Sequence, residues 1–534
     1  MHMFAKLKSL FRPASAEGAG ATPPVGADLL AAGQAAALKE EIKALAAKKE
    51  AGAAALRRLL PAARSAGWAD VELAKLECYI EMYSGCLKST YQKVIDGGLA
   101  KNDFDLMMAL AVQLYLFDRF AEARALFEQF DAAGADRFEE AFFCGIYGYI
   151  VYVSGAKIDE ATAIFDRPLD KGLHCPCLVV NAYGIYFEAG RHERTRELRQ
   201  LIWRHYADDW EAIHAVSVTE LACDYYPEGF RLAESRYRMM ELLGDKSSIN
   251  PSLLGRRRWQ GEPLDGKRIL VHAEQGLGDL VMCARYFPLL QQKATEVVVH
   301  CREVAMPLLA HNYPGIIWEP DRYQQPVTSR FDCWTGTLSL PFHFDTAADS
   351  VPGTTGYLRI PPEQEAYWAG RLAELADRDA LRIGLAWSGS PGHRRDKRRS
   401  LGFAAIESHV RKFPHVRFFA LQTTVPEVLP ANVINVSEEL VTLADTAALI
   451  DRMDLVITVD TSIVHIAGAL GKPTWLLLPK RYEWRWSLEG EGNNWYDSVN
   501  VLRQHAHDDW SGALEDAFGT RLSGFLASLD RPDK

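Results

Sequence analysis

The chain has 534 residues, of which 48% are hydrophobic and 24% charged, and its net charge is -10. This length suggests roughly two to four domains, each large enough to bury its own core. The acidic balance excludes a general basic surface for nucleic acid or an anionic membrane, and the composition is that of a soluble globular protein.

The cysteines and the N-terminus indicate where the protein resides. The nine cysteines are scattered without metal-ligand spacing, which is typical of a reducing cytoplasm. No stretch approaches the roughly 18 apolar residues of a membrane span, and residues 1–12 lack the apolar core of a signal peptide. We expect a cytoplasmic protein. The basic and apolar residues 4–12 leave open a peripheral contact with the inner membrane, with a frayed tail as the simpler interpretation.

The first part of the chain has a helical pattern. Residues 13–35 are rich in Ala, Gly and Pro, which predicts that residues 1–35 form a flexible segment. Residues 36–246 show helical periodicity. Similar turn-and-helix segments recur roughly every 34 to 38 residues, beginning at Phe117, Ser154, Ala189 and Tyr225. This period predicts an α-helical repeat region of the tetratricopeptide type, whose stacked helices would bind a polypeptide.

After residue 247, apolar strand patterns alternate with helical ones, which predicts parallel sheets covered on both faces. We expect one α/β half over residues 247–380 and a second over residues 381–534, with a helical segment at its end. In sheets of this kind ligands bind beyond the carboxyl ends of the strands. The expected strands lie at residues 268–275, 296–301, 316–320, 382–389, 416–422, 433–437, 454–459 and 474–478.

The first candidate motif follows the first expected strand. It reads Glu274-Gln275-Gly276-Leu277-Gly278-Asp279, and its glycines allow the backbone to approach a ligand closely. Asp279 has two interpretations: a carboxylate that caps the following helix, or a general base. Position 281 is Val, so the motif departs from the dinucleotide fingerprint and disfavours a nicotinamide dehydrogenase.

The second motif is a basic loop after the strand at 382–387. Five cations lie within residues 394–399, where they would repel one another unless they are solvated or face an anion. Its position suits a diphosphate, whose charge Arg or Lys would neutralise and to which Ser388 or Ser400 would donate a hydroxyl hydrogen bond. A solvated surface loop is the competing interpretation.

The third motif joins a buried strand to a helix at Asp460-Thr461-Ser462, with His465 one turn further on. A helix N-terminus flanked by hydroxyls favours an anion such as a phosphate. Asp460 and His465 lack a third ligand nearby for a metal, and a capped helix with a packed histidine is the plain alternative. The chain lacks a P-loop and a nucleophile elbow, which disfavours a P-loop kinase or an α/β-hydrolase.

Together these motifs resemble the heptosyltransferase-like glycosyltransferases of family 9, joined to tetratricopeptide-like repeats as in bacterial flagellin and protein glycosyltransferases. The resemblance covers about residues 267–505 and is carried by HAEQGLGDLVMCARYFPLL, IGLAWSGSPGHRRDKRRSL, FFALQ and DLVITVDTSIVHIAGALGKPTWLLLP, followed by EWRW. It implies a GT-B fold of two Rossmann-like halves, with the acceptor mostly on the first and the nucleotide-sugar on the second.

The resemblance also implies roles for individual residues. Asp279 matches the catalytic carboxylate, with Glu274, Gly276 and Gly278 on the acceptor side of the cleft. The residues that match or fall in donor-binding positions are Ser388, Arg394, Lys397, Arg399, Gln422, Asp460, Thr461, Ser462 and His465. It implies transfer without a metal or other cofactor. Ser462 stands where the family commonly has Gly, so the resemblance does not identify the sugar.

We therefore expect an enzyme that moves a sugar from a nucleotide-sugar to Ser or Thr of a polypeptide docked by the repeats, with flagellin as one candidate. The reason is architectural, because a transferase acting on lipopolysaccharide does not need so long a repeat region. The alternatives are a heptosyltransferase-like enzyme acting on lipopolysaccharide or another glycan, and a non-catalytic repeat scaffold that binds nucleotide. Self-association is left open, and nucleic acid is not an expected partner.

Overall fold

The computed structural model describes residues 60–61, 70–83, 87–99, 104–117, 119–131, 137–155, 157–238, 249–322, 325–376, 380–390, 396–480, 483–488, 490–506 and 509–529. The predicted flexible segment 1–35 lies outside these ranges. The chain divides into two compact units, Met1–Ala212 and Ile213–Lys534. Each is described by itself.

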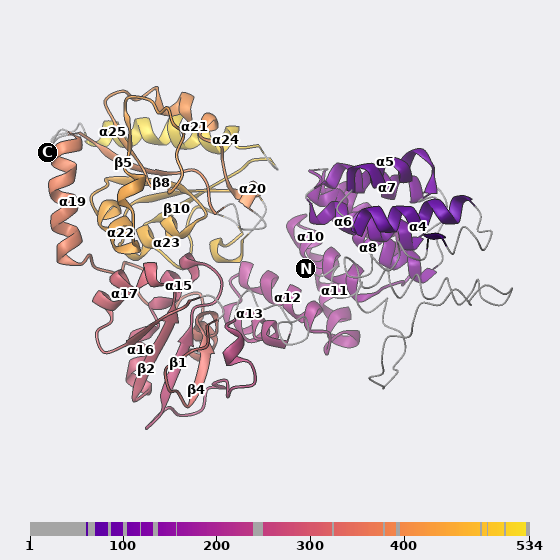
Figure 1. The fold of residues 1–534 in the computed structure, drawn as a ribbon, viewed down its shortest axis with the longest axis horizontal. Coiled ribbons are helices and arrows are strands. Elements are labelled where there is room, and N and C mark those ends of the chain that lie inside the picture. The colour runs from indigo at the N-terminus through magenta and orange to yellow at the C-terminus, as the bar shows by residue number, and fades with distance from the viewer. Residues whose placement is uncertain are drawn as a thin grey trace. The chain divides into compact units, whose positions relative to one another are not determined.

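The described part of the first unit is helical (Figure 1). Its helices are α4 (Asp70–Tyr83), α5 (Leu87–Asp96), α6 (Phe104–Leu116), α7 (Phe120–Asp131), α8 (Arg137–Val153), α9 (Ile158–Leu169), α10 (Pro176–Glu188), α11 (His192–His205) and the start of α12 (Trp210–Ala222). The turn-and-helix segments predicted at Phe117, Ser154 and Ala189 contain α7, α9 and α11, so the helical periodicity is confirmed there.

Small residues set how closely these helices pack. A Cβ atom on Gly145 of α8 would lie 2.7 Å from the Leu178 Cα of α10, and one on Gly148 would lie 2.3 Å from the Phe165 ring of α9. Several polar contacts join residues 36 positions apart, among them the Asn181 amide with the Gly145 carbonyl. These contacts agree with a repeating helical unit, and its assignment to the tetratricopeptide type stays a prediction.

The second unit contains two parallel sheets, as the alternating pattern predicted. The first sheet has the order β3-β2-β1-β4, with all strand pairs parallel. The second has the order β10-β9-β8-β5-β6-β7 and is also parallel. The strands are β1 (Arg268–His272), β2 (Glu296–Cys301), β3 (Ile317–Pro320), β4 (Cys333–Gly336), β5 (Arg382–Ala386), β6 (Arg417–Ala420), β7 (Val433–Asn435), β8 (Leu455–Val459), β9 (Thr474–Leu478) and β10 (Val499–Arg503).

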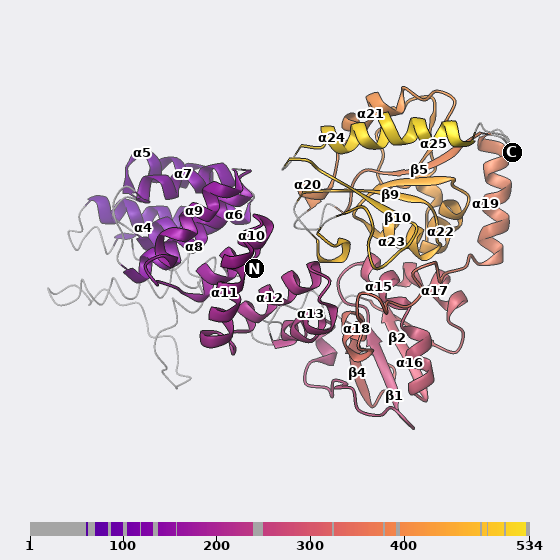
Figure 2. The same ribbon diagram turned by 180° about the vertical axis from the view of Figure 1, so that it is seen from behind.

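Helices cover both faces of the second sheet because successive residues of a strand point to opposite sides. Leu455 and Ile457 of β8 pack in the same cluster as Ile406 of α21 and Phe518, whereas Val456 packs with α22 and α23. Figures 1 and 2 show α21, α24 and α25 on one side of the sheet and α22 and α23 on the other. The helices named here are α21 (Phe403–Val410), α22 (Leu443–Asp451), α23 (Ser462–Ala469), α24 (Ser511–Leu514) and α25 (Leu522–Leu529).

The remaining helices of this unit pack on the first sheet and along the boundary between the halves, except α20 (Asp396–Arg399), which lies in the loop after β5. They are the end of α12, α13 (Tyr226–Ala233), α15 (Leu277–Ala284), α16 (Phe287–Lys293), α17 (Met306–Asn312), α18 (Leu340–His343), α19 (Pro362–Leu375) and α20. Buried residues of α13, α15, α22 and α23 belong to one hydrophobic cluster with both sheets. The two halves therefore share a continuous core.

The structure differs from the sequence prediction in three places. β4 and β10 were not predicted: β4 reads CWTG, with only two apolar residues, and β10 is interrupted by the exposed Asn500. The single helix expected after β1 is two helices, α15 and α16. We expected the helical region to end at residue 246, whereas the compact division lies after Ala212, because α13 shares the core of the α/β halves.

Candidate functional site

The candidate site lies where the strand order of the second sheet reverses. The chain proceeds from β5 outward to β7, then returns to β8 beside β5 and proceeds outward to β10. In open parallel sheets such a switch point leaves a crevice at the carboxyl ends of the two central strands. Here the basic loop follows β5, and Asp460-Thr461-Ser462 follows β8. The topology thus brings the second and third motifs together.

The loop after β5 is held by Gln422, which follows β6. The Gln422 Oε1 atom accepts the backbone N–H groups of Trp387 and Ser388 at 2.8 and 3.0 Å, and its Nε2 donates to Ser388 Oγ at 3.0 Å. Gln422 and Ser388, both predicted to bind the donor, therefore contact each other. In this structure the Gln422 amide orders the loop.

Arg399 connects the basic loop to the third motif. Its Nη1 donates to the Asp460 carbonyl oxygen at 2.8 Å, and its Nε donates to Asp396 at 3.1 Å. Arg394 lies outside the described residues. Lys397 lies in α20, and its side chain is likewise outside the description.

The helix after β8 begins as predicted. Thr461 caps α23 by accepting the Ile463 N–H at 3.3 Å, and Ser462 is its first residue. The Asp460 side chain is buried, and burial, with the nearby Glu483 carboxylate, raises the pKa of Asp460 to about 6. Such a shift marks a group whose charge is incompletely compensated.

His465 is a buried, neutral side chain one turn into α23. Burial, with the Arg485 guanidinium, lowers its pKa to about 3. Its Nδ1 lies 3.0 Å from the Tyr496 hydroxyl, and its ring stacks on Trp486 with centroids 5.4 Å apart. His465 is therefore the packed histidine of the plain interpretation, placed against the first motif.

The first motif meets α23 directly, because α15 packs against α23. A Cβ atom on Gly278 would lie 2.6 Å from His465 Cδ2, so only glycine allows this approach. Gln275, just before the helix, has a φ of 59°, in the left-handed region that few side chains adopt.

Asp279 caps α15 and forms an ion pair. Its Oδ2 accepts the Gly276 N–H at 3.1 Å, so the carboxylate caps the backbone at the start of the helix. Its Oδ1 accepts both Nε, at 3.1 Å, and Nη2 of Arg485. The sequence left open whether Asp279 is a cap or a base. The structure contains the cap, and it places the carboxylate at the boundary between the halves, opposite the start of α23.

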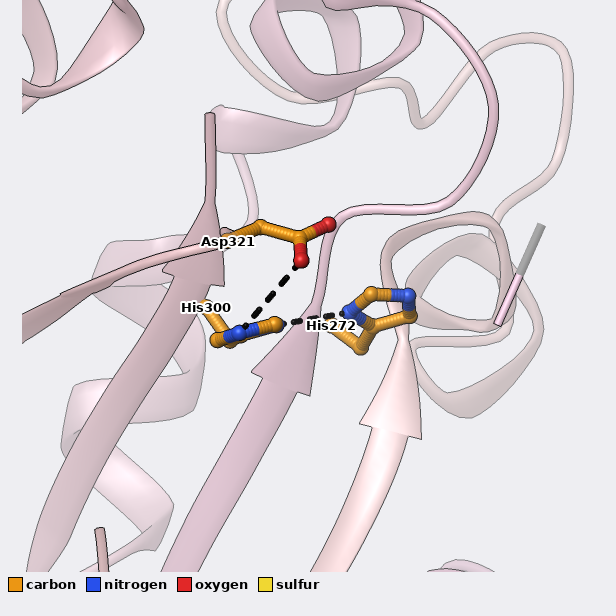
Figure 3. Close-up of side chains that lie close together, drawn as sticks. All are labelled: His272, His300 and Asp321. Atoms are coloured by element: carbon orange, nitrogen blue, oxygen red, sulfur yellow. Dashed lines mark hydrogen bonds and ion pairs between the residues drawn. The ribbon is translucent and has the colours of Figure 1, made fainter. Parts of the chain in front are cut away.

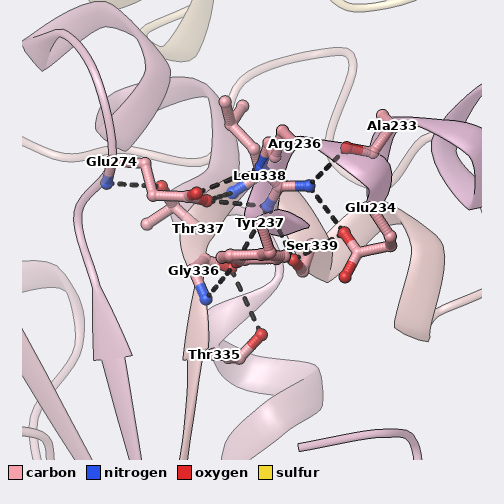
Figure 4. Close-up of polar contacts among 10 residues, drawn as sticks. All are labelled: Ala233, Glu234, Arg236, Tyr237, Glu274, Thr335, Gly336, Thr337, Leu338 and Ser339. Carbon is pink, nitrogen blue, oxygen red and sulfur yellow. Dashed lines mark hydrogen bonds and ion pairs between the residues drawn. The ribbon is translucent and has the colours of Figure 1, made fainter. Parts of the chain in front are cut away.

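Glu274 lies in a closed network rather than at an open surface (Figure 4). Its carboxylate accepts Arg236 Nε and Nη2 at 3.0 and 2.9 Å and the Leu338 N–H at 3.1 Å. Tyr237, Ser339 and Glu234 complete the network around Arg236. The Glu274 side chain is fully buried, so contact with an acceptor would require the network to open.

A second polar cluster lies at the ends of β1, β2 and β3, where His272, His300 and Asp321 point toward one another (Figure 3). Among the described residues it is the only His, Cys and acid group compact enough for a metal ion. The Asn250 N–H donates to His272 Nε2 at 3.2 Å, so the neutral His272 ring carries its proton on Nδ1.

A hydrogen bond joins the two histidine rings. His272 Nδ1 lies 3.1 Å from His300 Nδ1, and His300 Nε2 lies 3.7 Å from Asp321 Oδ1. The Asn250 N–H and the two rings thus fit a chain of hydrogen bonds that ends at His300, whose Nε2 faces Asp321 beyond hydrogen-bond distance. This chain accounts for the contact between the two rings as neutral side chains, and the expectation of a metal-free site stays a prediction.

Sequence reasoning assigned no role to Arg485, although it noted EWRW. The available signal was a cation between two tryptophans just beyond a buried parallel strand. Arg236 was also missed, because its helical segment was assigned to the repeats.

The comparisons with known proteins define a class over part of the chain. Residues 428–478 match the model of the family described as Glycosyltransferase family 9 (heptosyltransferase). This match covers β7, α22, β8, α23 and β9. It confirms the predicted resemblance in this segment and supports an enzyme of glycosyl transfer.

Particular relatives extend the comparison. The chain is 27% identical over 301 residues to Protein FlbA of Caulobacter vibrioides, covering 51% of this chain and about half of the relative, 49%. The Escherichia coli ADP-heptose lps heptosyltransferase II is 13% identical over 49% of this chain and 98% of its own, with a TM-score of 0.35. The iron-containing dodecameric glycosyltransferase TibC of enterotoxigenic E. coli H10407 is 15% identical to this chain. The match covers 51% of this chain and 77% of TibC, with a TM-score of 0.31.

One further observation concerns membranes. Within the described ranges, no helix combines the length and the apolar character needed to cross a bilayer.

Proposed function

We propose that this chain transfers a sugar from a nucleotide-sugar to a hydroxyl of a polypeptide acceptor, without a metal cofactor. The observation that carries the proposal is the family 9 match, because it includes Asp460, the start of α23 and His465. These residues lie beside the switch point and against the helix that Asp279 caps.

In the proposed reaction, Asp279 takes the proton of the acceptor hydroxyl, and the acceptor oxygen forms a bond with the anomeric carbon. The bond from that carbon to the phosphate oxygen breaks, and the nucleotide leaves with the electron pair. The N-terminus of α23 and the basic loop that contains Arg399 would stabilise this charge. Support comes from the contact of Arg399 with the Asp460 carbonyl oxygen.

The helical unit supports a polypeptide acceptor. Stacked helical repeats form extended surfaces for peptide segments, and contacts between residues 36 positions apart indicate such repetition. The family description favours a second acceptor equally, a lipopolysaccharide-type glycan. In that case the helices would serve assembly.

The test uses the full-length protein with a panel of UDP-, GDP-, ADP- and CMP-sugars. Polypeptide and lipid-linked glycan acceptors are offered in parallel, and mass spectrometry measures the increment of a sugar. We expect an increment on a polypeptide, with a loss of about 10²- to 10⁴-fold in D279N, the size of a typical general-base contribution. An increment only on the glycan would select the second acceptor. No increment and no nucleotide release with any donor would refute the proposal.

A further inference from the structure

Arg485 occupies a central place among the charges at the boundary between the halves. Its guanidinium directs Nε and Nη2 to the Asp279 Oδ1 atom and lies 3.6 Å from Glu483 through Nη1. Burial opposes the charged form, but these carboxylates dominate and raise the pKa of Arg485 above its ordinary value. Arg485 and Asp279 are 206 residues apart and come from opposite halves.

The segment that carries Arg485 is held firmly. Trp484 packs edge to face against Phe230 and Trp495, with ring centroids 5.8 and 6.0 Å away, and Trp486 is fully buried. The guanidinium lies over the Trp484 ring, 4.5 Å from its centroid. Trp484 thus orients the guanidinium plane, and the buried Trp486 anchors the chain on the other side of Arg485.

The backbone of this segment is also fixed. Arg503 donates to the carbonyl oxygens of Trp486 and Ser487, and the Ser487 hydroxyl donates to Asp224 at 3.0 Å. A residue held in this way presents its guanidinium in one orientation. That favours a fixed role over a swing between distant partners.

We propose that Arg485 is the positioning residue of the Asp279 carboxylate, supplied by the donor half to orient the base of the acceptor half. The Gly276 N–H and Arg485 bind different oxygens of the same carboxylate, and together they fix its plane. A base is effective only when its lone pair is aligned with the hydroxyl proton, so loss of one anchor lowers turnover. The role rests on the proposed transferase function and makes the carboxylate geometry depend on the contact between the halves.

The test compares R485M, R485K, D279N and the double variant R485M/D279N in the full-length protein. R411M is the matched control, because Arg411 forms an exposed pair with Glu407 at the end of α21. We expect R485M to lower kcat by about 100-fold, the cost of a small misplacement of a catalytic group, with the KM for the donor unchanged within about 2-fold. R485K should recover part of the loss, and R411M should match the wild type.

The double variant separates positioning from other roles. If Arg485 acts through Asp279, R485M/D279N is no slower than D279N alone, because residues that act as a unit are not additive. Losses that multiply, an unchanged kcat in R485M, or a raised donor KM with normal kcat would each overturn the inference. Near-ultraviolet circular dichroism checks that R485M is folded. If it is not, R485K and R485K/D279N replace R485M and the double variant in the comparison. A wild type without turnover would refute the proposed function and this inference with it, whereas a wild type and R485M of equal turnover would refute this inference alone.

Discussion

The two sheets of the second unit carry contrasting polar groups at their carboxyl edges. In the first sheet, Glu274 is enclosed by Arg236 and the Leu338 N–H, and the two histidines contact each other beside Asp321. In the second sheet, Asp460 is buried with a raised pKa near Glu483, and a cation-rich loop follows β5. Polar groups that satisfy one another stabilise a fixed edge, whereas a buried carboxylate with a raised pKa is a candidate functional group.

The largest expected effect is a loss of stability when the Arg236–Glu274 pair at the edge of the first sheet is broken. R236M would leave the Glu274 carboxylate buried without its cation, and breaking a buried pair in this way costs about 3–5 kcal/mol. We expect the apparent Tm to fall by roughly 10 °C in thermal unfolding followed by circular dichroism. R257M is the control, because its pair with Glu262 is exposed and should contribute less than about 1 kcal/mol. An equal fall in Tm in R236M and R257M would show that the buried pair at the edge of the first sheet does not stabilise the fold more than an exposed pair does.

The second prediction concerns pH, because His465 and Asp460 shift in opposite senses. The pKa of His465 is lowered from 6.5 to about 3, so the unfolded chain binds its proton first, and stability is lost as pH falls below about 6.5. Asp460, raised from 3.8 to about 6, adds stability as pH falls through that range. In H465N the loss on acidification should be smaller by about 1.4 kcal/mol per pH unit between pH 6 and 4.

Urea unfolding at several pH values measures this difference. H311N provides the control, since His311 lies at the end of α17 and has no comparable burial. If the unfolding free energy of H465N depends on pH as that of the wild type does, His465 is not held neutral in the folded protein. It would then not contribute to the pH dependence of stability.

Much of this arrangement could be predicted from the sequence, because it depends on patterns among residues that are close together in the chain. Apolar runs that end in polar or glycine residues identify β1, β5 and β8, and parallel topology then places Ser388 near Asp460. The helix cap at Thr461 is likewise a local pattern of hydroxyl and backbone.

Other features depend on contacts that no local pattern reveals. Arg485 meets Asp279 across 206 residues, and Arg236 meets Glu274 across 38. Gly278 was expected to admit a ligand, whereas its missing Cβ admits the His465 ring. β4 escaped prediction because its sequence, CWTG, has only two apolar residues and forms no apolar run or alternation. The sequence thus predicts which side chains follow the strands, but not which of them pair with one another through ion pairs and hydrogen bonds.

A third prediction tests the close approach of α15 to α23. G278A would place a Cβ atom 2.6 Å from His465 Cδ2, and overpacking of this kind typically costs about 1–3 kcal/mol. G370A in α19 is the matched control, because its Cβ would meet nothing within 4 Å, and alanine stabilises a helix interior by about 0.5–1 kcal/mol over glycine. Chemical denaturation of both variants gives the comparison. A G278A protein as stable as G370A would show that the two motifs are not in tight contact.

The smallest effect on stability is expected at the carboxyl edge of the second sheet, where the Arg399 side chain can be removed with little loss of folding free energy. Arg399 is about one-fifth exposed and donates to a carbonyl oxygen and to Asp396. If it binds donor phosphate, R399M should weaken nucleoside diphosphate binding about 10-fold, or roughly 1.4 kcal/mol, within the range for a hydrogen bond to a charged group. Its Tm should stay close to that of R411M. Isothermal titration calorimetry with UDP, GDP and ADP measures the affinity. A large loss of stability with unchanged affinity would instead make this edge resemble that of the first sheet, with Arg399 serving the fold.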